Sequence, residues 1–153
     1  KMGITVDGVG MECHATLDEG PPVNEIETAI VNFARAGLKV HISELDVDVL
    51  PSAWDYQGAE IDVNYDYSEK INPFKNALPR IVSAKLAERY RELFELFVKH
   101  RDKITRVSFW GTTDDESWKN DWPVEGRTNY PLLFDRSRSP KDAYFAVRNL
   151  KSQ

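Results

Sequence analysis

Hydrophobic residues along the chain follow strand-like and helix-like spacing in turn. Short apolar stretches bounded by turn residues predict three strands, over residues 4–14, 38–47 and 104–112. Apolar residues at i, i+3, i+4 and i+7 predict two intervening helices, over 24–35 and 84–100. This alternation of strand and helix favours an α/β fold with a parallel sheet and crossover helices.

Two further segments complete the pattern. A last helix is predicted over 140–150, with Ser139 as its N-cap and Pro140 at its first position. The segment 49–83 carries several prolines and five aromatic residues, Trp54, Tyr56, Tyr65, Tyr67 and Phe74. Loops of this length are uncommon in compact domains, so we expect an ordered loop that serves a function.

Three parallel strands neither close a barrel nor complete most doubly wound sheets. The sequence therefore predicts that residues 1–153 form one portion of a larger α/β architecture rather than a complete one. An isolated sheet of this kind would expose its edges, and exposed edges promote association. We expect a partner for it, either a missing N-terminal half or another copy of the chain.

Composition narrows the possible partners. The 153 residues include 20 Lys and Arg against 25 Asp and Glu, a net charge of −5 that would repel phosphate backbones and anionic membranes. We therefore expect no nucleic-acid or membrane partner, and the first residues lack the apolar core of a signal peptide. One cysteine and three scattered histidines predict no disulfide and no metal site.

Polar residues gather where each predicted strand ends, which is where parallel α/β folds place their chemistry. Glu12 and His14 share one face of the first strand, and Glu44 and Asp46 share one face of the second. If both faces meet, His14 can bond two carboxylates through its two ring nitrogens. Carboxylates in an aromatic-rich cleft are typical of glycoside hydrolysis.

The motifs at these strand ends carry a family resemblance. The sequences DGVGMECH at 7–14, HISELD at 41–46 and FWGTTD at 109–114, followed by Ser117 and Trp118, strongly resemble the last strands of family-10 glycoside hydrolases. These are endo-β-1,4-xylanases built on a (β/α)8 TIM barrel. The resemblance covers essentially the whole chain and implies that it forms the sixth to eighth β/α units, an incomplete barrel.

The resemblance also implies roles for individual residues. Glu44 would be the nucleophile of a retaining mechanism, with His14 and Asp46 orienting it, and Trp110 and Trp118 would wall the sugar site. The acid/base Glu of the family would lie on a strand that this chain lacks. The implied substrate is xylan or a xylo-oligosaccharide, with no metal or organic cofactor, and the implied location is extracellular or periplasmic.

One position departs from the family pattern. The family commonly has Gln two residues before the His, where this chain has Glu12, which we group with the substrate-binding residues. A third carboxylate near Glu44 would raise the pKa of one of these groups by like-charge repulsion.

Other interpretations stay open on the residues alone. Glu44 could be a surface carboxylate, and the tryptophans could pack a core. The chain could be a non-catalytic fragment that folds by association, or part of a hydrolase of another β-glucan. His41 and His100 lack evident partners in the sequence and are expected to be ordinary polar residues.

Overall fold

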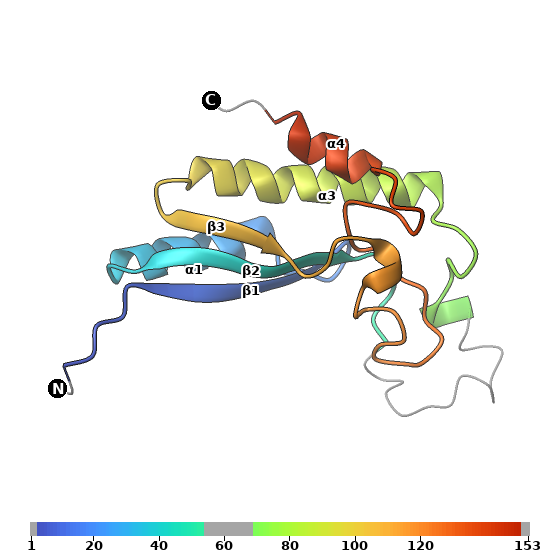
Figure 1. Ribbon diagram of the computed structural model, residues 1–153, viewed down its shortest axis with the longest axis horizontal. Helices are drawn as coiled ribbons and strands as arrows, with labels where there is room; N and C mark the ends of the chain where they lie inside the picture. Colours follow the sequence, from blue (N-terminus) through green and yellow to red (C-terminus); the bar gives the residue numbers. More distant parts are fainter. Residues whose placement is uncertain (1–2, 54–68, 151–153) are drawn as a thin grey trace.

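The computed structural model describes residues 3–53 and 69–150, drawn in colour in Figure 1. The strands are β1 (Gly8–Thr16), β2 (Lys39–Asp48) and β3 (Ile104–Phe109). The helices are α1 (Val23–Arg35), α3 (Arg80–Lys99) and α4 (Asp142–Arg148), with a short 3-10 helix, η3 (Asp114–Glu116). The predicted strands and helices are confirmed, with boundaries shifted by a few residues.

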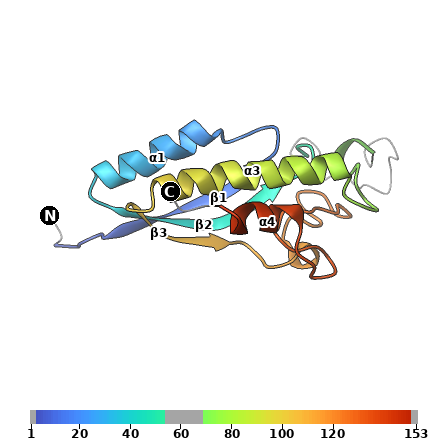
Figure 2. The same cartoon turned by 90° about the horizontal axis from the view of Figure 1, so that it is seen from above.

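The three strands form one parallel sheet in the order β1-β2-β3. Figures 1 and 2 show α1, α3 and α4 on the same side of this sheet, so within the described residues its other face carries no helix. All three strands run the same way, and their carboxyl ends meet the loop that follows β3 (Figure 1). The sheet thus has one helix-covered face and one open face, with the polar strand ends at one edge.

The core lies between β2 and the helices. Its fully buried side chains come chiefly from the middle strand and the two long helices: Val40, Ile42, Leu45, Val47, Ile30, Leu86, Tyr90 and Leu93. The hydroxyl of Tyr90 donates a hydrogen bond of 2.6 Å to the carbonyl of Pro131. A buried hydroxyl needs a hydrogen-bond partner, and here the partner is a backbone carbonyl of the loop beyond β3. The bond therefore holds α3 against that loop.

A bulge in β2 interrupts the strand alternation. Residues 12 and 14 of β1 pair with 43 and 46 of β2, while 107 and 109 of β3 pair with 42 and 45. β2 therefore holds one residue more than each neighbour, and Glu44 takes this place with a φ of 57°.

The bulge changes which side chains of β2 face the helices. Val40 and Ile42 face the core before it, and Leu45 and Val47 face the core after it. Uninterrupted alternation would have placed Asp46 on the core face with Val40 and Ile42. Instead, Asp46 pairs with His14 of β1. The extra residue thus turns Asp46 from the core face toward His14.

The last helix begins later than predicted. α4 starts at Asp142 with Lys141 at its N-cap, so the prediction of Ser139 as the cap and Pro140 in the first turn was wrong. Asp135 holds the preceding segment in a turn by accepting the backbone N–H of Ser139 at 2.8 Å. The N–H of Lys141 bonds the carbonyl of Leu133 at 2.9 Å, which keeps this stretch extended.

The segment 49–83 is shorter as a loop than predicted, because α3 already begins at Arg80. Four of its aromatic residues, Trp54, Tyr56, Tyr65 and Tyr67, lie outside the described residues. No helix in the described part of the chain is long and apolar enough to cross a membrane.

Candidate functional site

The carboxyl ends of β1 and β2 bring one histidine between two carboxylates. Nδ1 of His14 lies 3.0 Å from Oδ1 of Asp46, and Nε2 lies 3.2 Å from Oε2 of Glu44. The predicted contact of His14 with both groups is confirmed. A histidine held at both nitrogens has a fixed ring plane, and it fixes the carboxylate on either side.

The two carboxylates differ in their surroundings. The side chain of Asp46 is fully buried, whereas that of Glu44 is about a quarter exposed. The hydrogen bond that Asp46 accepts from His14 raises the pKa of the imidazole above its ordinary value, and the bond to Glu44 acts in the same direction. The imidazole is therefore biased toward its doubly protonated form, in which it donates to both carboxylates.

Trp118 closes one side of this group. Its indole Nε1 donates a 2.8 Å hydrogen bond to Oδ2 of Asp46, and its ring meets the His14 ring edge-on at 5.0 Å. Trp110 follows β3 directly, and its backbone N–H bonds the carbonyl of Leu45 at 3.0 Å. Trp110 is 48% exposed and Trp118 is 38% exposed, and Trp118 lies against His14 and Asp46.

Lys119 is a member of the site that the sequence did not reveal. Its Nζ lies 3.8 Å from Asp46 and 3.7 Å from Asp48, and it stands 4.8 Å from the centre of the Trp118 ring. The side chain is nearly buried, which leaves its charge to compensate these two aspartates. The sequence signal was only that a lysine directly follows Trp118.

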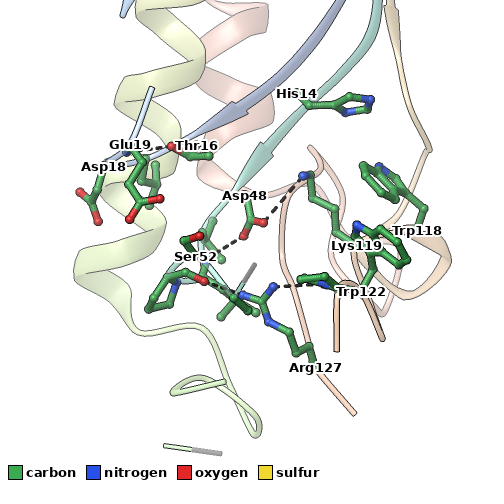
Figure 3. A pocket seen from close by; sticks show the side chains of 16 residues that line it. His14, Thr16, Asp18, Glu19, Asp48, Ser52, Trp118, Lys119, Trp122 and Arg127 are labelled. Atoms are coloured by element: carbon green, nitrogen blue, oxygen red, sulfur yellow. Dashed lines mark hydrogen bonds and ion pairs between the residues drawn. The ribbon is translucent and has the colours of Figure 1, made fainter. Parts of the chain in front are cut away.

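A cavity of about 350 Å³ extends from His14 along the ends of β1 and β2. Figure 3 shows Lys119 pointing to Asp48 across it, with Trp118 and Trp122 on one wall. Arg127 lies below, buried, and its guanidinium donates to the carbonyls of Ile71, Trp122 and Pro51. Arg127 therefore braces the loops that form the floor.

The asparagine that follows this loop braces β2. Asn129 donates to Oδ1 of Asp48 at 2.7 Å and accepts the N–H of Tyr130 at 2.8 Å. Asn129 is fully buried, so its amide connects the end of β2 to the segment before α4.

Glu12 lies beside the same group. One ligand atom each from Glu12, His14 and Glu44 can be chosen so that all lie within 4.8 Å of one another. The composition predicted no metal site, and these three residues nevertheless have the types and spacing that could hold a cation. The side chain of Glu12 is exposed on the open face of the sheet.

The other two histidines have partners that the sequence did not indicate. Nε2 of His41 lies 3.0 Å from the Ser108 hydroxyl on β3. Nε2 of His100 lies 2.7 Å from Glu27 and links the end of α3 to α1. The expectation that both lacked partners was wrong, because the partners are distant in sequence, but neither histidine reaches the site.

Cys13 points away from the site into the core. It is buried, and burial raises the pKa of its thiol to about 11. A free cysteine in this position packs as a small apolar residue.

Residues 1–150 match the family model described as Glycosyl hydrolase family 10. Endo-1,4-beta-xylanase A of Xylanibacter ruminicola is 40% identical over 139 residues, covering 91% of this chain and 37% of that protein. The chain thus spans well under half the length of this relative, and corresponds to the C-terminal part of such a xylanase.

Two solved structures are similar to this chain over most of its length. A novel GH10 endoxylanase from a sugarcane soil metagenome is 49% identical with a TM-score of 0.82, covering 92% of this chain and 38% of that one. A mutant protein solved in complex with xylotriose is 30% identical with a TM-score of 0.76, covering 94% of this chain and 39% of that one. The predicted fold class, an incomplete TIM barrel, is confirmed.

Proposed function

The chain belongs to glycosyl hydrolase family 10, and on this premise we propose that it supplies the nucleophile side of a retaining endo-β-1,4-xylanase. The observation that carries the proposal is the hydrogen-bonded row of Glu44, His14 and Asp46 at the ends of β1 and β2. A carboxylate oriented in this way, beside exposed indole rings, has the form that displacement at a sugar carbon requires.

Glu44 is the group that attacks the anomeric carbon. His14 holds Oε2 of Glu44, which leaves the second carboxylate oxygen to form the bond to the sugar as the glycosidic bond breaks. A carboxylic acid from the rest of the barrel protonates the leaving oxygen. The same group then takes a proton from water, and the water oxygen attacks the glycosyl ester and frees Glu44.

Asp46 and His14 are positioning residues in this scheme. Asp46 is fully buried and receives hydrogen bonds from His14 and from Trp118, so it sets the orientation of both rings. The contact of Nε2 of His14 with Oε2 fixes the direction in which the carboxylate of Glu44 points, as a nucleophile aimed at one sugar carbon requires.

Trp110 and Trp118 are the sugar-contacting walls. The C–H faces of a pyranose are apolar and pack on flat aromatic rings. Both residues are more than a third exposed, Trp118 lies against His14 and Asp46, and the backbone of Trp110 bonds Leu45, the residue after Glu44. The xylotriose complex of a relative supports a β-linked xylose oligomer as the ligand class. Because polymeric xylan cannot cross a membrane, we place the enzyme outside the cell.

The test uses a complete barrel that carries this chain, either the full-length protein or the chain joined to the preceding part of the soil endoxylanase. Glu44→Gln should lower xylan hydrolysis by at least about a thousandfold, since about 4 kcal/mol of transition-state stabilisation is lost. Glu116→Gln, an exposed carboxylate of η3 at the same end of the sheet, is the matched control.

Two results would refute the assignment. One is activity of Glu44→Gln within about tenfold of the parent. The other is a mechanism-based fluoro-sugar that labels a different carboxylate. Faster hydrolysis of cellulose oligomers than of xylo-oligosaccharides would instead retain the mechanism and move the substrate to another β-glucan.

A further inference from the structure

We propose that Glu12, His14 and Glu44 form a binding site for a divalent transition-metal ion of the zinc type. The three residues come from two neighbouring strands, and their ligand atoms lie within 4.8 Å of one another. One imidazole nitrogen and two carboxylate oxygens are ligands that zinc and its first-row neighbours accept.

Two of the three ligands already have the spacing that a bound metal needs. Ligand atoms about 2.0–2.1 Å from a tetrahedral ion lie roughly 3.3 Å from each other. Nε2 of His14 and Oε2 of Glu44 are 3.2 Å apart. The ion would replace the proton shared by these atoms, and the exposed Glu12 side chain is free to rotate toward it.

Nδ1 of His14, the nitrogen that would not bind the ion, has the kind of partner that metal-binding histidines usually have. Histidines that bind metals usually donate their second ring N–H to a carboxylate, which fixes the tautomer and directs the lone pair of the other nitrogen. Oδ1 of Asp46 takes this place at 3.0 Å from Nδ1. Asp46 is fully buried and held by Trp118, so the orientation of His14 does not depend on the ion.

Charge also favours a cation here. Glu12, Glu44 and Asp46 bring three carboxylates around one histidine. The nearby cation Lys119 lies on the far side, toward Asp46 and Asp48. Among the described residues, Lys119 thus neutralises Asp46 and Asp48 rather than Glu12 and Glu44, and a divalent ion between these two glutamates would reduce their repulsion.

Glu12 distinguishes the proposed metal site of this chain from the pattern of the family. Where the resemblance expects a neutral Gln, the chain has a third anionic ligand. Reverting it by Glu12→Gln changes one atom of an exposed side chain, so the variant should fold as the parent does.

Occupation of the site would block the proposed reaction, a consequence that rests on the proposed function. A metal bound to Oε2 of Glu44 would withdraw electron density from the whole carboxylate, so its second oxygen, the one proposed to attack the sugar, would be a weaker nucleophile. Binding itself does not depend on catalysis and is measured separately.

The decisive experiment is a calorimetric titration of the full chain, in whatever association state it adopts, with ZnCl2 alone. We expect one Zn²⁺ per chain, at least about tenfold weaker binding for Glu12→Gln, and unchanged binding for the exposed control Glu116→Gln. MgCl2 should give no comparable heat, because Mg²⁺ prefers an all-oxygen octahedral shell.

Equal zinc affinity of the parent and Glu12→Gln overturns the proposal, as does the absence of a stoichiometric site in a parent chain whose circular dichroism shows it to be folded. A second variant, His14→Asn, must also weaken binding by at least about tenfold. In the complete barrel, zinc should inhibit the parent more strongly than Glu12→Gln. If zinc binds as described but no variant of the barrel hydrolyses xylan, the metal site stands and the proposed function fails.

Discussion

Glu44 combines the proposed nucleophile with an unusual backbone. Its φ of 57° is in the left-handed region that side chains other than Gly, Asn and Asp seldom adopt. Glu44 is also the extra residue of the β2 bulge, after which the side chains of the strand alternate in the opposite sense. The bulge therefore accounts both for the strained backbone and for the altered alternation. Strained residues of this kind cluster at functional sites, where the surrounding fold holds them.

Because of this strain, we expect the usual order of stability between an alanine and a glycine variant to be reversed at this position. Glu44→Ala and Glu44→Gly both remove the carboxylate and its contact with His14, but only glycine relieves the positive φ. In urea unfolding we expect Glu44→Gly to be more stable than Glu44→Ala by about 1 kcal/mol. In an ordinary strand position glycine would be the less stable of the two, so that order would contradict the assignment of strain.

Lys119 makes a second prediction at this scale. Replacing it by Met removes the charge next to the fully buried Asp46 while keeping a long side chain. Asp46 keeps its hydrogen bonds with His14 and Trp118, so the loss of this charge should lower the free energy of unfolding by about 1–2 kcal/mol. Lys119→Arg retains the charge and is the control, and a Met variant within about 0.5 kcal/mol of the parent would show that the aspartates do not need this lysine.

At the scale of elements, the turn after β3 depends on a glycine that cannot be replaced. Gly111 has a φ of 141°, and a Cβ at this position would lie 2.8 Å from Cδ1 of Leu132. Leu132 is fully buried, so it has no room to retreat. This close approach holds the loop with Trp110 and Trp118 against the segment before α4.

Gly111→Ala should therefore destabilise the fold for two reasons, backbone conformation and overlap. Gly37, which ends α1, has a φ of 83° and nothing within 4 Å of its would-be Cβ, so Gly37→Ala carries the backbone cost alone, about 1 kcal/mol. We expect Gly111→Ala to lose at least about 1 kcal/mol more than Gly37→Ala in thermal or urea unfolding. If both variants lost the same free energy of unfolding, Leu132 would have moved aside for the new methyl group without measurable cost.

Elements with strong periodicity were predictable from the sequence, and those set by distant contacts were not. The apolar spacing of α1 and α3 and the polar strand ends sufficed to find the helices and to bring His14 to its carboxylates. The bulge at Glu44 shows in the sequence only as a change of phase in the apolar positions, from 40 and 42 to 45 and 47, and the predicted shared face of Glu44 and Asp46 did not take it into account. The late start of α4 depends on a turn closed by Asp135, and the place of Lys119 depends on β2, which lies far from it in sequence.

At the scale of the whole molecule, the sheet of the described residues has two unpaired edges, β1 and β3, and one face without helices. β1 and β3 each pair only with β2 among the described residues, and the face opposite the helices presents Glu12 and the 48% exposed Trp110. Parallel sheets are normally covered on both faces, and unpaired strand edges pair with other chains. The relatives are longer, since the chain covers about 38% of the soil endoxylanase.

We therefore expect the 153-residue chain alone to associate through the free edges of β1 and β3, and to hydrolyse no xylan. In the proposed mechanism Glu44 supplies one of the two carboxyl groups that the reaction needs, and a nucleophile without an acid leaves the glycosidic oxygen unprotonated. Analytical sedimentation of the chain, paired with a xylan assay before and after addition of the preceding part of a relative's barrel, tests both statements. A folded monomer that cleaves xylan would contradict them, and Glu12, the carboxylate nearest the Glu44 and His14 pair on the open face, would then be the first residue to mutate as the acid.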